Sequence, residues 1–303
     1  MNAELVVTDR EGLLSRWIKP SSDTEDEQQK RAERMVKAAV DRSPVAAKAK
    51  VYAKGSYPNS TNVRRDSDVD IVVECCEVYF HDGAAPSSST PKQRRPKSLW
   101  WPPEEWRSTV HSLLQDHFGR QQVDADHNVA FNIPAVDGSR PSIDVVPSYE
   151  YRAYRRLDGA GDPAIGSLVW CKDGKKIVNW PKQQLVNGRN KNTSTGHRYK
   201  NMVRALKNAE NELVRLGRVT EQPSYLMECL VYNVPDPILK RGHSLDDTFR
   251  AALTHLIEGT LNDVHKSWAE PNEIKPLFGA GQKWSVDDAH KLVVETFYLL
   301  NYV

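Results

Sequence analysis

The chain has 303 residues, of which 39% are hydrophobic and 27% are charged. This balance excludes a largely disordered chain and suits a soluble globular protein with one bilobed fold or two domains. The net charge of +2 gives no chain-wide basic surface, so a nucleic-acid activator is not supported. Because the sequence contains neither a secretory signal nor an apolar run of the ~20 residues that a bilayer requires, we expect a cytoplasmic protein without a membrane partner.

Helical and extended patterns alternate in the first half of the chain. Apolar residues at helical spacing predict helices over 3–18, 25–41 and 102–117. Runs rich in β-branched residues predict strands over 50–54 and 68–80, and two or three more within 121–150. Between them, 55–65 and 83–98 are rich in turn-forming residues and are predicted to be loops.

The second half has a different character. The segment 151–195 is predicted to be rich in loops, with short strands at 167–171 and 176–180. Helices are predicted over 197–216, 223–232, 245–262 and 286–299. We therefore expect an α+β fold, with a mixed β-sheet lobe over 1–195 and a helical C-terminal lobe over 196–303. Packing of the N-terminal helices on the second lobe remains an open alternative.

One segment carries most of the chemical information. Gly55-Ser56 begins a loop, and Asp68-Val69-Asp70 begins the strongest predicted strand. A glycine lets the backbone approach a ligand closely, and a serine offers a hydroxyl and an amide to phosphate. Asp68 and Asp70 are two apart on a strand, so their carboxylates share one face and repel each other unless a cation lies between them.

A third carboxylate follows later in the chain. Asp144 lies in the apolar run Ser142-Ile143-Asp144-Val145-Val146-Pro147, where an unpaired charge is costly. Three carboxylates of this kind suit magnesium, which prefers oxygen ligands and shares them with substrate phosphates. The alternative is that these carboxylates are surface groups at strand ends. The combined spacing favours the metal site over that reading.

This pattern resembles the nucleotidyltransferase superfamily of DNA polymerase beta. More narrowly, it is similar to the cGAS/DncV-like nucleotidyltransferases of the bacterial anti-phage systems called CBASS. Two predicted helices support the narrower resemblance, because Tyr199–Asn208 and Pro223–Tyr232 resemble the family's basic and Ser-Tyr residues around the donor triphosphate. The chain has no Cys-His cluster with zinc-site spacing, which argues against the DNA-sensing device of the animal relative.

The resemblance implies roles for individual residues. Gly55 and Ser56 would cradle the donor phosphates. Asp68, Asp70 and Asp144 would bind Mg²⁺, for which Mn²⁺ can substitute. Four residues of the helical half would bind the nucleotide: Lys207 and its rival Lys200 on the triphosphate, Ser224 on phosphate and Tyr225 by stacking on a base.

A further polar residue precedes a proline. Asn179-Trp180-Pro181 resembles a polar-Pro element that lies near the acceptor base in the family. The amide of Asn179 can both donate to and accept from a base edge. Asparagine before an aromatic residue and proline is also ordinary turn chemistry, and we favour that interpretation here.

The implied activity is synthesis of a cyclic di- or trinucleotide second messenger from nucleoside triphosphates, with release of pyrophosphate. The resemblance further implies an effector, encoded elsewhere, that binds the product, and leaves room for regulatory protein partners. Two alternatives stay open. One is another nucleotidyltransferase, which makes a linear oligonucleotide or extends an RNA end. The other is an inactive nucleotide-binding module, although all three carboxylates are present.

Overall fold

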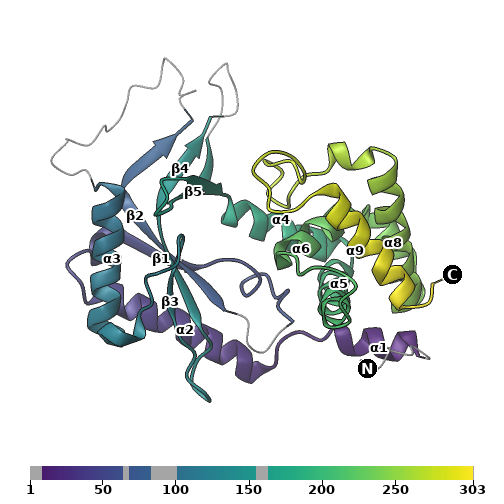
Figure 1. Ribbon diagram of the computed structural model, residues 1–303, viewed down its shortest axis with the longest axis horizontal. Coiled ribbons are helices and arrows are strands. Elements are labelled where there is room, and N and C mark those ends of the chain that lie inside the picture. Colours follow the sequence, from purple (N-terminus) through teal and green to yellow (C-terminus); the bar gives the residue numbers. More distant parts are fainter. Residues whose placement is uncertain (1–8, 64–67, 83–100, 155–162, 303) are drawn as a thin grey trace. The chain divides into compact units, whose positions relative to one another are not determined.

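The computed structural model describes residues 9–63, 68–82, 101–154 and 163–302. Contacts divide the chain into two compact units (Figure 1). The helical unit contains Met1–Ser21, Asn59–Arg64 and Gln183–Val303, and the sheet unit contains Ser22–Pro58 and Arg65–Lys182. These boundaries differ from the expected division at 195/196. The chain crosses between the units several times, because the short segment from Asn59 lies with the helical unit while its sequence neighbours on both sides lie with the sheet unit.

The sheet unit is built on six strands: β1 (Ala49–Ala53), β2 (Val69–His81), β3 (Phe131–Ile133), β4 (Ile143–Ala153), β5 (Ala164–Trp170) and β6 (Lys176–Asn179). Their order is β1-β2-β4-β5-β6, and β3 pairs with the start of β4. β2 and β4 run parallel, whereas the other neighbours are antiparallel. The mixed sheet thus has one parallel pair at its centre.

Two helices cover one face of this sheet, α2 (Asp23–Asp41) and α3 (Pro103–Phe118). A capping box between Ser22 and Glu25 satisfies the first amides of α2, and a proline begins α3. Val69, Ile71, Val73 and Cys75 of β2 pack into the core beneath these helices, and after a register shift in the strand Val78 and Phe80 do so. Since side chains alternate along a strand, the even-numbered residues before this shift, Asp70, Val72 and Glu74, project from the opposite face.

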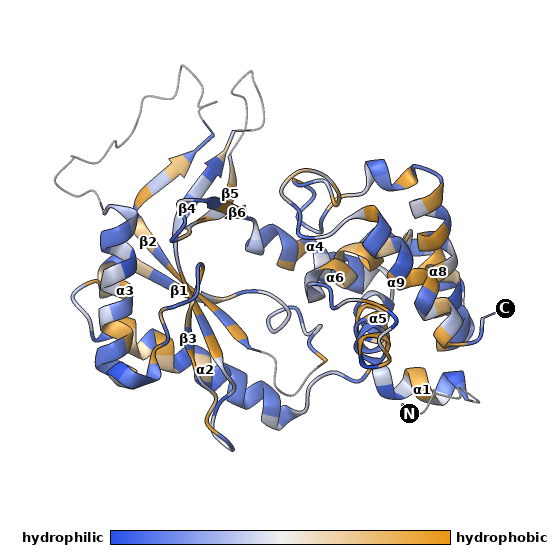
Figure 2. Cartoon of the chain, viewed as in Figure 1, coloured by the Kyte–Doolittle hydropathy of each residue, from blue (hydrophilic) through white to orange (hydrophobic). Residues whose placement is uncertain are grey.

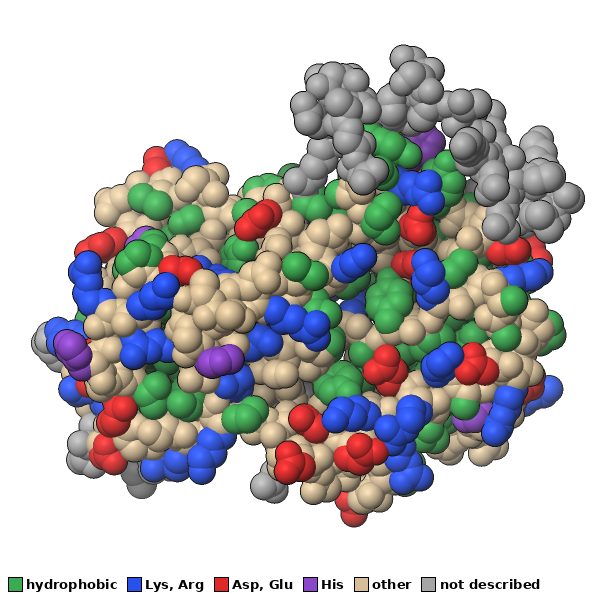
Figure 3. Space-filling view, turned by 180° about the vertical axis from the view of Figure 1, so that it is seen from behind, with side chains coloured by type: hydrophobic (Ala, Val, Ile, Leu, Met, Phe, Trp, Pro, Cys, Tyr) green, Lys and Arg blue, Asp and Glu red, His purple; other side chains and the backbone are tan. Residues whose placement is uncertain are grey.

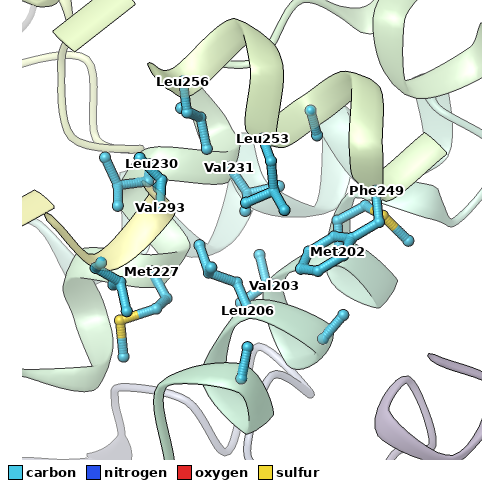
Figure 4. Packing of buried hydrophobic residues seen from close by; sticks show 14 of the residues in the cluster. Met202, Val203, Leu206, Met227, Leu230, Val231, Phe249, Leu253, Leu256 and Val293 are labelled. Carbon is cyan, nitrogen blue, oxygen red and sulfur yellow. The ribbon is translucent and has the colours of Figure 1, made fainter. Parts of the chain in front are cut away.

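The helical unit has seven α-helices in the described residues: α1 (Arg10–Trp17), α4 (Pro181–Ser194), α5 (Arg198–Arg215), α6 (Ser224–Tyr232), α7 (Asp236–Arg241), α8 (Leu245–Leu261) and α9 (Val286–Leu299). Figure 4 shows its core, where Met202 and Leu206 of α5, Leu230 of α6, Leu253 of α8 and Val293 of α9 meet. Figure 2 shows the hydrophobic stripes of these helices alternating with hydrophilic ones. Three short 3₁₀ helices, Ala46–Lys48, Arg120–Gln122 and Val264–Ser267, complete the elements.

Most predicted elements are confirmed, and the α+β class with a mixed sheet and a helical C-terminal region is among them. The prediction for 151–195 was wrong in its last third, because α4 is a helix. Its sequence lacks an apolar stripe, and Gly188 alone is buried, so periodicity could not find it. α7 was not predicted, because a helix of six residues is too short to show a helical period. The predicted loop at 83–98 and the start of the predicted helix 3–18 lie outside the described residues.

The surface carries charges of both signs, as the nearly balanced numbers of basic and acidic residues predict, and the cysteines are not paired. Acidic and basic side chains are intermingled on the face of the molecule drawn in Figure 3. Cys75, Cys76, Cys171 and Cys229 are all free thiols. In the part of the chain that the structure describes, no helix combines the length and the apolar character that crossing a membrane demands.

Candidate active site

The three predicted carboxylates share one face of the sheet. Asp68 directly precedes β2, and Asp70 is its second residue. In the parallel pairing of β2 with β4, Asp70 lies opposite Asp144. Residues that face each other in neighbouring strands project to the same side, so all three carboxylates point away from α2 and α3.

The negative charges in this group are poorly compensated. Burial is the main reason why the pKa of the Asp70 carboxyl is raised, and the charges of Asp144 and Asp68 add to it, while Lys54 opposes the shift. Burial likewise raises the pKa of Asp68, with a hydrogen bond from Ser142 acting in the other direction. Like charges held together on a partly desolvated surface favour the arrival of a cation.

Asn132 is a member of this group that sequence reasoning missed. It lies opposite Asp144 in the β3–β4 pair, and its amide nitrogen donates to Asp144 Oδ1 at 2.9 Å and to Ser142 Oγ at 2.9 Å. The bond fixes the orientation of the Asp144 carboxylate. The sequence feature that could have identified Asn132 is its position between two apolar residues, Phe131 and Ile133, which are buried in the three-residue strand β3.

Gly55 approaches the carboxylates at very short range. It has a left-handed φ of 79°, and a Cβ built there would lie 2.9 Å from Asp70 Oδ2. The neighbouring amide of Lys54 donates to the Asp70 carbonyl at 2.9 Å, which ties this turn to β2. Both the backbone angle and the lack of space therefore require glycine. Ser56 is the next residue of the same turn and is half-buried.

Ser224 and Tyr225 occupy the N-terminus of α6. Ser224 is exposed, and in the described part of the chain no side chain caps this helix, so its first amides and its dipole can meet an anion. Tyr225 is half-buried, and its hydroxyl donates to Glu270 Oε2 at 3.2 Å. Its ring also meets Trp284 edge-on with centroids 6.3 Å apart. Tyr225 is thus held by its hydroxyl as well as by its ring.

The two candidate lysines of α5 lie two turns apart on one side of the helix, and the Glu228 carboxylate acts on both. Lys200 is half-buried, whereas Lys207 is only 3% exposed. Burial lowers the pKa of Lys207 to about 8, Glu228 opposes this shift, and Arg204 adds to it. Sequence analysis anticipated neither this burial nor Glu228 as the partner of Lys207.

Asn179 is not a turn residue, so that interpretation was wrong. It ends β6 and lies opposite Ser167 of β5, which in turn lies opposite Glu150 of β4. Glu150 is six residues beyond Asp144 on the same strand, and even spacing keeps both on one face. The Asn179 side chain therefore projects from the same face of the sheet as the three carboxylates.

Comparison with known proteins identifies the family. The model of the cGAS/DncV-like nucleotidyltransferase C-terminal helical domain matches residues 186–301. The cyclic dipyrimidine nucleotide synthase CdnE of Legionella pneumophila is 37% identical over 283 residues, covering 91% of this chain and 93% of that protein. The chain belongs to the cGAS/DncV-like nucleotidyltransferases. It is accordingly a nucleotidyltransferase, and cyclic oligonucleotide synthesis of the CBASS type is its class of activity.

Other members of the family support the assignment over nearly the whole chain. The CdnE cyclic dipyrimidine nucleotide synthase of Cecembia lonarensis is 30% identical and covers 94% of this chain and 96% of its own. The structure of the Rhodothermus marinus CdnE c-UMP-AMP synthase with Apcpp and Upnpp has a TM-score of 0.83 at 29% identity, with 96% of each chain covered. Nucleoside triphosphates are therefore the substrate class.

The carboxylate group suits the divalent cation that the family uses. In the described residues, no three His, Cys, Asp or Glu side chains form an assembled metal-binding group. The fit lies instead in the chemistry of the donors. Asp68, Asp70 and Asp144 supply only oxygen ligands, share one face and repel one another. A hard divalent cation takes oxygen ligands, can be bound by side chains on one face, and neutralises the repulsion between them.

Proposed function

We propose that this nucleotidyltransferase makes a cyclic dinucleotide with at least one pyrimidine base. The observation that carries the proposal is the pairing of Asp70 with Asp144 on one sheet face, with Gly55 against Asp70. The sheet unit would be the catalytic lobe, and the helical unit would bind the donor. The enzyme would work in the cytoplasm, where its triphosphates are made, and its product would act on an effector encoded elsewhere.

The names of three relatives that match over more than 90% of this chain support the choice of base. The Legionella and Cecembia proteins are cyclic dipyrimidine nucleotide synthases, and a Rhodothermus marinus relative at 31% identity is a cyclic UMP-AMP synthase. Each product contains at least one pyrimidine. Asn179 offers a donor and an acceptor on the face of the catalytic carboxylates, which suits the edge of a uracil or cytosine base.

The reaction is a nucleotidyl transfer carried out twice. A ribose hydroxyl of one nucleotide attacks the α-phosphorus of the other, a new O–P bond forms, the α–β bridging bond breaks, pyrophosphate leaves, and the hydroxyl proton passes to solvent. Asp68, Asp70 and Asp144 would hold Mg²⁺, or Mn²⁺ in its place, which supplies charge stabilisation when bound. Orientation of the two nucleotides by the chain supplies much of the remaining rate enhancement.

Individual residues would divide the work of binding the donor. The turn at Gly55 and Ser56 would present its backbone to the donor phosphates. Ser224 would bond to a phosphate oxygen, and Tyr225 would lie against the base. Lys207, or Lys200 in its place, would supply positive charge to the triphosphate.

The test is product analysis. The protein is incubated with ATP, GTP, CTP and UTP and MgCl₂, treated with phosphatase, and the product is identified by mass spectrometry. The proposal expects a phosphatase-resistant cyclic dinucleotide that contains uracil or cytosine. A product that phosphatase degrades would indicate a linear oligonucleotide, and a purine-only ring would overturn the choice of base. If no pyrophosphate is released, the chain is a binding module.

Replacement of Asn179 sharpens the same test. Asn179→Asp keeps the size of the side chain but removes its donor, so we expect the ratio of pyrimidine to purine in the product to change while total pyrophosphate release persists. Ser167→Ala, on the facing residue of β5, is the control and should leave that ratio unchanged. An unaltered ratio in Asn179→Asp would remove Asn179 from base selection.

A further inference from the structure

An acidic residue lies in the apolar middle of α6. Glu228 is 2% exposed, and residues 226–231 around it are all buried. A buried carboxylate is costly unless hydrogen bonds and an opposite charge compensate it. The partners of Glu228 therefore indicate why the helix carries it.

Two of these partners come from a distant segment of the chain. Glu228 Oε1 accepts from Asn59 Nδ2 at 2.6 Å, and Oε2 accepts from Thr61 Oγ1 at 3.0 Å. Gln184 of α4 donates to Oε1 at 3.1 Å, and Lys207 of α5 provides positive charge. The carboxylate thus joins three helices of the helical unit to one short stretch around residue 60.

A second buried side chain holds the same stretch. Arg204 of α5 donates from Nη1 to the carbonyl of Ser60 at 2.6 Å and from Nε to the carbonyl of Ile18 at 2.6 Å. Ser60 has a φ of 52°, a left-handed conformation that a residue with a side chain adopts only when its surroundings enforce it. Asn62 bonds to Ser21. Four consecutive residues, 59–62, are therefore each tied to the helical unit, and we name this stretch the anchored segment.

The anchored segment lies between Ser56 and Asp68 in the sequence. It begins three residues after Ser56 and ends six residues before Asp68. Both of those neighbours belong to the sheet unit, whereas the anchored segment belongs to the helical unit. The covalent chain therefore passes within three residues from the Ser56 turn, the proposed phosphate-binding turn, to a point that is fixed on α5 and α6.

We propose that Glu228 is a positioning residue for nucleotidyl transfer: by holding Asn59 and Thr61 it fixes the anchored segment, and through it the orientation of the Ser56 turn. This role rests on the proposed function, since it concerns the rate of that reaction. Because the Glu228 oxygens accept from Asn59, Thr61 and Gln184, this role acts through the segment that Glu228 holds and requires no contact with substrate. Misplacement of reacting groups by about 1 Å can cost on the order of a hundredfold in rate, so loss of a distant anchor is enough to slow the chemistry.

The first experiment measures the anchor without any reaction. Hydrogen exchange of residues 55–63 is followed by mass spectrometry in the folded protein. We expect slow exchange in the unaltered chain and faster exchange in Glu228→Ala and Thr61→Val. Glu228→Gln should exchange nearly as slowly as the unaltered chain, because the Gln oxygen still accepts from Asn59 and Gln184. Unchanged exchange in both Glu228→Ala and Thr61→Val would overturn the proposal.

The second experiment uses a matched pair of threonines. Thr61 and Thr296 are both 0% exposed, and each donates its hydroxyl within the helical unit, Thr61 to Glu228 and Thr296 to the Leu292 carbonyl. Thr61→Val and Thr296→Val should lower the melting temperature similarly. The proposal expects kcat to fall at least about tenfold in Thr61→Val, with a smaller change in donor KM, and to persist in Thr296→Val.

The outcomes separate this proposal from the proposed function. Equal losses of kcat in Thr61→Val and Thr296→Val would reduce the role of Glu228 to stability and overturn the proposal. Should the unaltered protein make a product other than a pyrimidine-containing ring, the proposed function fails, and pyrophosphate release still reports on the anchor. Should it make none, hydrogen exchange alone decides whether Glu228 holds the anchored segment.

Discussion

The two units hold charged side chains in opposite ways. In the sheet unit, Asp68, Asp70 and Asp144 bring like charges together, and burial raises the pKa of the first two. In the helical unit, Glu228 is surrounded by donors and faces the cation of Lys207. One group is electrostatically incomplete without a ligand, and the other is already satisfied.

Under the proposed function, this difference separates groups that act on substrate from groups that hold the structure. A repelling set of carboxylates gains stability when a cation arrives, so binding and chemistry can be coupled there. A satisfied buried carboxylate gains nothing from a ligand, and its removal leaves donors and a cation unpaired. We therefore expect substitutions in the sheet unit to change turnover more than stability, and buried substitutions in the helical unit to change both.

The largest effect is expected at the carboxylates. Asp70→Asn keeps the shape of the side chain but removes a charged ligand, so turnover should fall by about a thousandfold or more. Because carboxylate repulsion is relieved, the melting temperature measured in a chelator should stay the same or rise. Turnover is measured as pyrophosphate release with Mg²⁺, and excess chelator should abolish it in the unaltered protein. Substantial turnover in an Asp68→Asn, Asp70→Asn double variant would contradict the mechanism.

Gly55 offers a sharper test, because a matched glycine exists in the same unit. Gly55 and Gly174 have similar left-handed φ values, 79° and 83°, but a Cβ meets Asp70 only at Gly55. Both Gly→Ala variants should lose about 1–2 kcal/mol of stability. Gly55→Ala should in addition lose turnover by about tenfold to a hundredfold, because Asp70 must move. Equal turnover in the two variants would show that the close approach to Asp70 is unimportant.

The same contrast explains what the sequence could predict. Asp68 and Asp70 were placed correctly on one face because the strand period of two fixes side-chain direction whatever surrounds the strand, whereas Asp144 joins them through the register of β2 with β4. Gly55 was found because close approach demands glycine, although its nearest group is Asp70 rather than a ligand. Local geometry governs these positions, and local geometry can be predicted from a short stretch of sequence.

Burial in the helical unit depends on segments that are distant in sequence. Lys207 lies on α5 and Glu228 on α6, and helical periodicity alone does not distinguish these two charged residues from exposed ones. Their surroundings include Asn59 and Thr61, more than 140 residues earlier in the chain. No local pattern could reveal this packing. The one available signal was Glu228 itself, an acidic residue inside an apolar helix, which implies a buried partner.

A pH experiment tests whether Lys207 acts on the donor triphosphate. Its pKa is lowered to about 8, so its positive charge is lost as the pH rises above that value. If the charge binds phosphate, donor Kd should rise by up to about tenfold per pH unit above pH 8. Glu228 and Arg204 face the same ammonium, and burial lowers the pKa of Arg204 to about 10, so the rise is measured between pH 8 and pH 9. Lys207→Met should bind weakly at every pH, and Lys200→Met should keep the alkaline rise. If only Lys200→Met loses that rise, Lys200 is the triphosphate ligand.

The stability of the protein should show the same titration with a defined sign. The folded-state pKa of Lys207, about 8, lies below its ordinary value of 10.5. Between these values the unfolded chain binds more protons than the folded protein, so the contribution of Lys207 to stability increases as the pH rises through this window. In urea titrations, the difference in midpoint between the unaltered protein and Lys207→Met should change in that direction from pH 8 to pH 10.

The smallest effect is expected at Tyr225, where the structure changes the prediction. Stacking alone would make Tyr225→Phe silent, but the hydroxyl donates to Glu270, a buried carboxylate that Asn272 and Gln282 also contact. Losing one bond of this kind costs about 0.5–1.5 kcal/mol of stability. Stacking is worth about 1–3 kcal/mol per base, so Tyr225→Ala should weaken donor binding more than Tyr225→Phe does. Calorimetry with a non-hydrolysable triphosphate and Mg²⁺ measures donor binding, and thermal unfolding measures stability.

Tyr232→Phe is the matched control. Tyr232 lies on the same helix as Tyr225, and its hydroxyl donates a similar bond to the Glu273 carboxylate, so its replacement should leave donor affinity unchanged. If Tyr225→Phe weakens the donor as much as Tyr225→Ala, the hydroxyl sets the position of the ring, and Glu270 joins Glu228 as a carboxylate of the helical unit that acts through a neighbour.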